Sequence, residues 1–232
     1  MTASESSNQD TGIPKKTGQT PAFLRYRIEF SKTGPLRYTS HLDLSRIWER
    51  TLRRAGLPVA YSQGFNPRPL IQLAATLPLG CESTCELIDV WLEGEAPPPE
   101  ELIPLLSKAA PEGLTIRTIQ AVNPNDPALQ TRTQAAVYHA SIGDQVSRQE
   151  LEERVASLLA QPEIRRTRRG RHYDLRPLIH ELSVLPASLP ILEMKLALSQ
   201  EKGTGRPDEV LEALGLEAQH ILITRTALIM KP

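Results

Sequence analysis

The sequence predicts an α+β protein made of two ferredoxin-like units in tandem. The order strand, helix, strand, strand, helix, strand (βαββαβ) occurs twice, in residues 23–122 and in residues 134–232. Residues 123–133 contain two prolines and are typical of a linker between the units. In a ferredoxin-like unit four antiparallel strands carry two helices on one face and leave the other face available.

The first unit opens with an alternating strand and a capped helix. Apolar side chains alternate with Arg25 and Arg27 between residues 24 and 30, which predicts a half-buried strand with both arginines on its outer face. Ser40 is placed to cap a helix, which Gly56 ends.

The remaining elements complete both units in the same order. In the first unit they are a loop at 57–69, strands at 70–77 and 84–92, a short helix after the prolines 97–99 with a kink expected at its internal proline, and a strand at 114–122. In the second unit they are a strand at 135–142, a helix at 147–160, strands at 174–184 and 192–198, a helix at 206–214 and a strand at 221–230.

Composition restricts the class of protein. With 232 residues, 40% hydrophobic, the chain can bury a core, but residues 1–22 are polar and predict a disordered tail. No run approaches the roughly 20 apolar residues that cross a bilayer, so we expect a cytoplasmic protein with no membrane contact. Cys81 and Cys85 are the only cysteines, too few for a disulfide scaffold or a four-cysteine zinc site, and we expect no metal and no cofactor in this chain.

Charge is unevenly distributed along a chain with no net charge. Residues 25–72 hold nine Lys and Arg against three Asp and Glu, whereas residues 82–163 hold five against fourteen. Residues 164–176 hold six against one. Arginine accounts for 20 of the 27 cations, which favours contacts to phosphate or carboxylate groups, although an arginine-rich genome would give the same count.

The entrance to the first helix is the first candidate anion site. The amide groups at a helix N-terminus attract anions, and Arg37, Ser40 and His41 could add donors there. The alternative is structural: Ser40 and Asp43 form a capping box and His41 is a surface residue.

The exposed face of that helix and the loop after it are the second candidate. Arg46, Arg50 and Arg53 share a face that could track a phosphate backbone, or could simply be solvated. The loop Tyr61–Pro69 combines two aromatic rings with an amide and an arginine, as in single-stranded RNA recognition. The alternative for Phe65 is to anchor the loop in the core.

The densest charge run, Arg165–Arg176, is the third candidate. Five of its arginines lie within seven residues and repel one another, so the run is easier to explain if an anion binds it. A mobile, solvated loop is the alternative.

The N-terminal motif RYRIEFSKTGPLRYTSHLDLSRIWERTLRRAGLPVAYSQGFNPRPLIQLAATLPLG, followed by CELIDVWL, resembles the radical-SAM-linked protein family. The resemblance extends over nearly all of residues 23–230 and includes Asp174–Pro177 and the stretch GTGRPDEVLEALG. Its members occur alone or as a C-terminal extension of radical S-adenosylmethionine proteins with a cobalamin-binding domain. The resemblance therefore implies a partner of that kind. Such an enzyme needs three closely spaced cysteines, which this chain lacks.

Together these features predict an accessory RNA-binding protein that works with a separate radical S-adenosylmethionine enzyme on tRNA or rRNA. Tyr61 and Phe65 would stack on bases. The residues expected at the RNA are Arg37, Ser40, His41, Arg46, Arg50, Arg53, Tyr61, Phe65, Asn66, Arg68, Arg165, Arg166, Arg168, Arg169, Arg171 and Arg176. One alternative is a metal-independent endoribonuclease with His41 as general base or acid and Arg37 or Arg46 stabilising the transition state. A second is a module that docks an acidic partner protein without nucleic acid.

Overall fold

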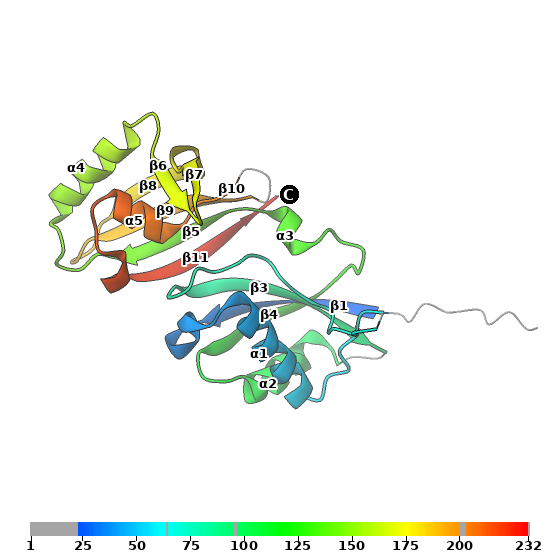
Figure 1. The fold of residues 1–232 in the computed structure, drawn as a ribbon. Coiled ribbons are helices and arrows are strands. Elements are labelled where there is room, and N and C mark those ends of the chain that lie inside the picture. Colours follow the sequence, from blue (N-terminus) through cyan, green and yellow to red (C-terminus); the bar gives the residue numbers. More distant parts are fainter. Residues whose placement is uncertain (1–22, 64, 95–96, 200–202, 232) are drawn as a thin grey trace, which may run out of the picture.

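The fold combines one large mixed sheet with helices from both halves of the chain (Figure 1). The computed structural model describes residues 23–63, 65–94, 97–199 and 203–231. The predicted tail, residues 1–22, lies outside the described residues.

The first half contains β1 (Phe23–Lys32), the 3-10 turn η1 (Gly34–Tyr38), α1 (His41–Arg54), β2 (Ile71–Leu73), β3 (Glu82–Glu93), α2 (Pro99–Ala109) and β4 (Leu114–Val122). A short helix, α3 (Leu129–Arg132), follows. The second half contains β5 (Thr133–Ser141), α4 (Arg148–Leu159), β6 (Arg165–Arg168), β7 (Arg171–Asp174), η2 (Arg176–Leu178), β8 (Ile179–Leu185), β9 (Ile191–Ser199), β10 (Gly203–Thr204), α5 (Pro207–Ala213), η3 (Ala218–His220) and β11 (Leu222–Met230).

The predicted α+β class is confirmed. In the first half the strands lie in the order β4-β1-β3-β2, and in the second half in the order β11-β5-β9-β8. In both, the first strand lies between the third and the last, which agrees with the ferredoxin-like order predicted for each unit. The division into domains stays a prediction, since α3 and the first residue of β5 fall inside the segment expected to be the linker.

The two halves are joined by a short parallel pairing of β3 and β11, with Thr224 opposite Glu82 and Arg225 opposite Ser83. The register of β1 against β3 shifts between Phe30, which lies opposite Glu86, and Lys32, which lies opposite Ser83. This shift places Ser83 on the same face of the sheet as Glu86. Arg225 lies opposite Tyr138, which belongs to the core of the second half. The side chains of Glu86 and Arg225 meet, so both halves carry their helices on the same face of the joined sheet.

Each half has its own apolar core beneath its helices. In the first half the ring centroids of Phe30 and Trp48 lie 4.9 Å apart in an edge-to-face arrangement, and Trp48 is fully buried. In the second half Leu151, Met194 and Leu211 are fully buried in a core shared by α4, α5 and the strands. In the described part of the chain every helix is too short or too polar to cross a bilayer.

The expectation that Arg25 and Arg27 lie on an open outer face was wrong. Arg25 is 2% exposed, and both guanidinium groups bind the buried carboxylate of Asp89, Arg27 with its Nε 2.9 Å from Oδ1. Arg25 also donates to the backbone oxygens of residues 124, 126 and 127. The segment after β4 therefore covers this part of the sheet, because its carbonyl oxygens accept the remaining hydrogen bonds of the buried Arg25 guanidinium.

Three expected boundaries were also wrong. The run around Arg165–Arg168 is a hairpin rather than a loop, and the strand expected at 174–184 is divided by η2 before β8 begins. The strand expected at 70–77 is reduced to β2, three residues long, because β11 occupies the rest of the β3 edge. Helix α2 continues through Pro104.

Candidate nucleic-acid interface

A cleft of about 1000 Å³ lies between the two halves. Its walls are the N-terminus of α1, the segment 76–79, the hairpin β6–β7 and residues near the start of α5. No Asp or Glu is among the described residues that line it. The ionisable bases there are His41, Arg168, Arg169, Arg171 and Arg206. The cleft brings together side chains from two of the basic segments that the sequence indicated, and its lining favours an anionic ligand.

Arg168 holds the hairpin in place. Its Nε lies 2.8 Å from Oε1 of Glu209, and its guanidinium also donates to the Thr204 backbone oxygen and to the Tyr173 hydroxyl. The Tyr173 hydroxyl in turn donates to the Glu209 carboxylate. Burial by itself would raise the pKa of the Glu209 carboxyl, but the hydrogen bonds from Arg168 and Tyr173 outweigh burial and lower this pKa. Arg168 was expected to contact RNA; it lines the cleft, and its donors are engaged within the protein, where they fix the hairpin to α5.

Arg169 and Arg171 are presented at the tip of this hairpin. Arg168 pairs with Arg171, which leaves Arg169 and Gly170 as the turn, with φ of 50° and 76°. Two residues with positive φ match a type I′ turn, which Gly170 adopts easily. Among the described residues Arg169 is the one non-glycine residue with positive φ. Neither the Arg169 nor the Arg171 side chain donates a hydrogen bond to a described residue, and both are exposed. They are therefore available to a ligand.

The N-terminus of α1 forms the opposite wall. The Ser40 hydroxyl accepts from the Asp43 amide at 3.1 Å and donates to its carboxylate at 2.7 Å, so the structural alternative for this pair, a helix cap, is correct. His41 is the first residue of the helix and faces the cleft. Partial burial lowers the pKa of His41, Arg225 and Lys32 act in the same direction, and Glu86 opposes them. His41 is therefore neutral at pH 7.

Three buried charges lie at the junction of the two halves, close to His41 and the cleft. Arg225 is fully buried, and its Nε lies 2.8 Å from Oε1 of Glu86. Its Nη1 donates to the backbone oxygen of Thr76, a residue of the cleft wall. Lys32, 1% exposed, donates from Nζ to the Thr39 backbone oxygen at 3.1 Å, next to the helix cap. Burial lowers the pKa of Lys32 and the Glu86 carboxylate opposes this shift. Two cations share one carboxylate here, which makes the potential of the cleft more positive.

The arginines of α1 continue from the cleft along the helix. Arg46, Arg50 and Arg53 are all exposed, and Arg46 pairs with Asp43 at 3.3 Å. Because α1 has 14 residues, it spans about 21 Å between the cleft and the loop 57–69, and this row lies between the middle of the helix and its C-terminal end. The sequence placed these three residues on one face correctly.

The loop 57–69 lies at the far end of β3 from the cleft. Val59 pairs with Leu92, whereas the cleft side of β3 begins near residue 82. Phe65 has 107% relative exposure, so it does not anchor the loop in the core. Tyr61, Asn66 and Arg68 are exposed beside it. These residues form a separate aromatic and cationic surface.

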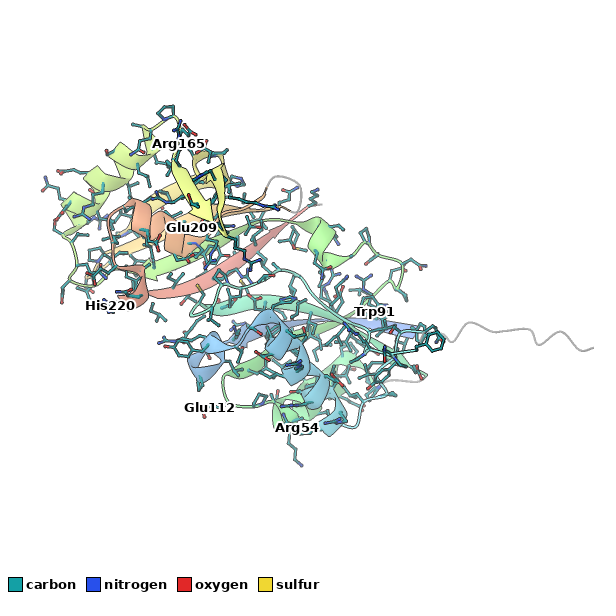
Figure 2. The ribbon with its side chains drawn as sticks, viewed as in Figure 1. Arg54, Trp91, Glu112, Arg165, Glu209 and His220 are labelled. Carbon is teal, nitrogen blue, oxygen red and sulfur yellow. The ribbon has the colours of Figure 1, made fainter. Side chains whose placement is uncertain are left out.

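Four other expected residues lie outside the cleft. Arg37 lines a neighbouring pocket, where its guanidinium lies over the Tyr38 ring at 4.7 Å from the centroid. Arg165 lies at the outer end of β6, away from Glu209 (Figure 2), and pairs with Glu163. Arg166 binds the Arg165 backbone oxygen, and Arg176 binds the backbone oxygens of Leu159 and Ile179. The structure does not bring these four side chains to His41.

Sequence reasoning missed Tyr173, Arg206, Lys32 and Arg225. Lys32, Arg206 and Arg225 do not belong to a dense run of like charges, so charge density gave no signal for them. Cys81 is buried and Cys85 half-buried, and burial raises their pKa values to about 12 and about 11. No group of three His, Cys, Asp or Glu side chains able to hold a metal occurs among the described residues.

Comparison with solved structures gives matches of low similarity. A crystal structure of an unknown protein from Galdieria sulphuraria matches with a TM-score of 0.26 and 13% identity over 91% of this chain and 100% of that chain. A putative glycine cleavage system transcriptional repressor matches with a TM-score of 0.25 and 13% identity over 90% of this chain and 99% of that chain. These TM-scores are too low to carry an argument. No curated protein matches.

A family model matches residues 25–207, which include β1, α1, the hairpin and the start of α5. The matched residues therefore contain both walls of the cleft. The chain belongs to the family DUF2344, uncharacterized proteins conserved in bacteria.

Proposed function

We propose that this protein binds RNA, with the phosphate backbone in the cleft between its two halves. The observation that carries the proposal is the juxtaposition of Arg169 and Arg171 with His41 and the N-terminus of α1. Guanidinium groups and helix amides are the donors that proteins use for phosphate. The buried Lys32 and Arg225 nearby strengthen the same potential.

A polymer fits this surface better than a small anion. The cations continue beyond the cleft along Arg46, Arg50 and Arg53 to the loop that contains Tyr61 and Phe65. A small ligand would occupy the cleft alone, whereas a strand could follow the row along α1 and reach the aromatic side chains.

The protein acts as an accessory to a separate radical S-adenosylmethionine enzyme with a cobalamin-binding domain, in tRNA or rRNA modification or processing. Support for this part of the proposal comes from the sequence resemblance and from the cysteine count, which is too low for the iron–sulfur cluster of such an enzyme. Co-purification of the enzyme with this protein after nuclease treatment tests the partnership.

Charge reversal in the cleft tests RNA binding. The double variant Arg169→Glu, Arg171→Glu should weaken binding of a fluorescein-labelled single-stranded 12-nucleotide RNA by about 100-fold, measured by anisotropy. Arg165→Glu is the control for each single reversal, Arg169→Glu or Arg171→Glu, since it makes the same change of charge at the outer end of the same hairpin. We expect this control to change the affinity less than threefold. Equal losses in the cleft variants and in this control, or no loss in either, would contradict the proposal.

A second function, endoribonuclease, is favoured by the position of His41. A neutral histidine in a cationic cleft can accept a proton from a ribose 2′-hydroxyl. Arg37 and Arg46, expected as its helpers, do not line this cleft, so Arg169 or Arg171 would have to take that role. Incubation of the same RNA with wild type and with His41→Ala separates the two functions. Cleavage by wild type that the variant loses would establish the enzyme, and intact RNA in both would leave binding alone.

A further inference from the structure

A second pocket adjoins the cleft and differs from it in chemistry. It has a volume of about 670 Å³ and is lined by η1, the segment 78–81, α5 and the residues that lead into β11. Pro78 and Leu79 line both cavities, so the two are separated only by this ridge. A strand held in the cleft could therefore place a neighbouring group in this pocket.

The pocket contains an aromatic platform. Tyr38 is 61% exposed, and the Arg37 guanidinium lies over its ring at 4.7 Å from the centroid. Leu79 on the ridge is 66% exposed, and Leu222 on the far wall is 40% exposed. Flat apolar groups that are exposed around a cavity are suited to stacking a planar ring.

Carboxylates surround this platform. Asp208 is paired with Arg206, and Glu217 with His220, a residue labelled in Figure 2. Glu212 also lines the pocket, is exposed, and has no ion pair with a described residue. Carboxylate oxygens accept hydrogen bonds from the amino groups of adenine, cytosine and guanine. Uracil has no amino group, and its carbonyl oxygens would face the carboxylate.

We propose that this pocket binds one unpaired base of the RNA strand, stacked on Tyr38 and read by Glu212 through an amino group. The inference rests on the proposed function, because the phosphate backbone of the same strand occupies the cleft. It defines the ligand as single-stranded RNA with an amino-bearing base next to the cleft. Tyr38 therefore acts as a third stacking residue, at a place apart from Tyr61 and Phe65.

The test uses labelled octanucleotides of adenine, cytosine or uracil and an eight-base-pair RNA duplex, with anisotropy as the readout. Wild type should bind the adenine and cytosine strands about tenfold more tightly than the uracil strand or the duplex. Tyr38→Ala should weaken binding of the adenine strand about tenfold. Tyr38→Phe, which keeps the ring, should retain most of the wild-type affinity.

Glu212→Gln should reduce the preference over uracil to less than threefold, because an amide can also donate to a carbonyl oxygen. Glu112→Gln is the matched control, since Glu112 is exposed and lines neither cavity, and it should keep the preference. Equal affinity for all strands, together with no change of affinity in Tyr38→Ala, would overturn the proposal of a base pocket. The proposed function would survive that result if Arg169→Glu, Arg171→Glu still weakened binding. Absence of RNA binding by wild type would contradict both proposals.

Discussion

The segment after α1 and the segment after α4 hold the same place in the chain order of the two halves, yet they are built differently. The first, residues 57–69, is a loop whose Phe65 is fully exposed. The second is the hairpin β6–β7, which Arg168 fixes to Glu209 on α5. As a result the hairpin directs Arg169 and Arg171 into the cleft, while the loop lies beyond the other end of α1.

In the hairpin one arginine of the dense run, Arg168, is paired with a carboxylate of the protein, and this pairing fixes the position of Arg169 and Arg171. The Arg168 guanidinium donates its hydrogen bonds within the protein rather than to a ligand, and this orders the neighbouring residues of the hairpin. In the loop the Arg68 side chain has no ion pair among the described residues, and the loop is closed by backbone contacts such as the one from the Arg68 amide to the Ser62 hydroxyl.

The largest effect should follow removal of the buried charge that joins the halves. Arg225→Met leaves the Glu86 carboxylate buried without its partner, so the free energy of unfolding should fall by about 3–5 kcal/mol in urea denaturation. Arg117→Met, which breaks an exposed pair with Glu29, should cost less than about 1 kcal/mol. Similar losses of unfolding free energy in the two variants would mean that the buried pair of Arg225 and Glu86 does not hold the two halves together.

A smaller loss of stability should follow release of the hairpin. Arg168→Ala leaves the nearly buried Glu209 carboxylate without its cation and should lower the free energy of unfolding by about 2 kcal/mol. Arg68→Ala in the loop should change it by less than about 0.5 kcal/mol. Arg168→Ala should also weaken RNA binding, although Arg168 does not itself contact the strand. A destabilised variant with unchanged RNA affinity would show that the hairpin need not be ordered before RNA binds.

The loop should matter only for long RNA. The double variant Tyr61→Ala, Phe65→Ala should weaken a 20-nucleotide strand about tenfold and leave a trinucleotide unaffected, because only the longer strand reaches from the cleft to the loop. Titrations of both strands by anisotropy measure this difference. Equal loss for the two lengths would place the loop at the cleft and remove the distinction between the two regions.

The smallest effect should come from protonation of His41. Its pKa is lowered from 6.5 by burial, so the folded protein without RNA loses stability as the pH falls below about 6.5, where the unfolded chain takes up the proton more readily. A bound phosphate favours the protonated form, so RNA affinity should rise about threefold between pH 8 and pH 5.5. His41→Gln should abolish this rise. A pH dependence that persists in the variant would assign it to another group.

The sequence predicted the order of the main elements because each has a local pattern. The alternation before Phe30, the Ser40 cap and the glycine after α1 act over a few residues, and Gly56 adopts the positive φ that ends the helix. The hairpin β6–β7 was missed because arginine favours neither strand nor loop strongly, and its order comes from Glu209, 41 residues away.

Half of the candidate site was predictable, because the residues of that half also lie in local sequence patterns. Local charge density indicated Arg169 and Arg171, and the helix pattern indicated Ser40 and His41. The cleft itself depends on the pairing of β3 with β11, which brings Arg225 and Glu86 together across 139 residues. No local pattern carries such a contact, and Arg25 was misplaced because its partner Asp89 is also remote, 64 residues away.

The salt dependence of RNA binding reports how many phosphates the cleft contacts. Each phosphate contact to a single strand contributes about 0.7 to the slope of log affinity against log salt concentration. Removal of two contacts in Arg169→Ala, Arg171→Ala should therefore reduce the slope by about 1.4 relative to wild type, whereas Arg165→Ala should leave it unchanged. The wild-type slope retained in the double variant would contradict the assignment of the cleft as the site of the RNA backbone.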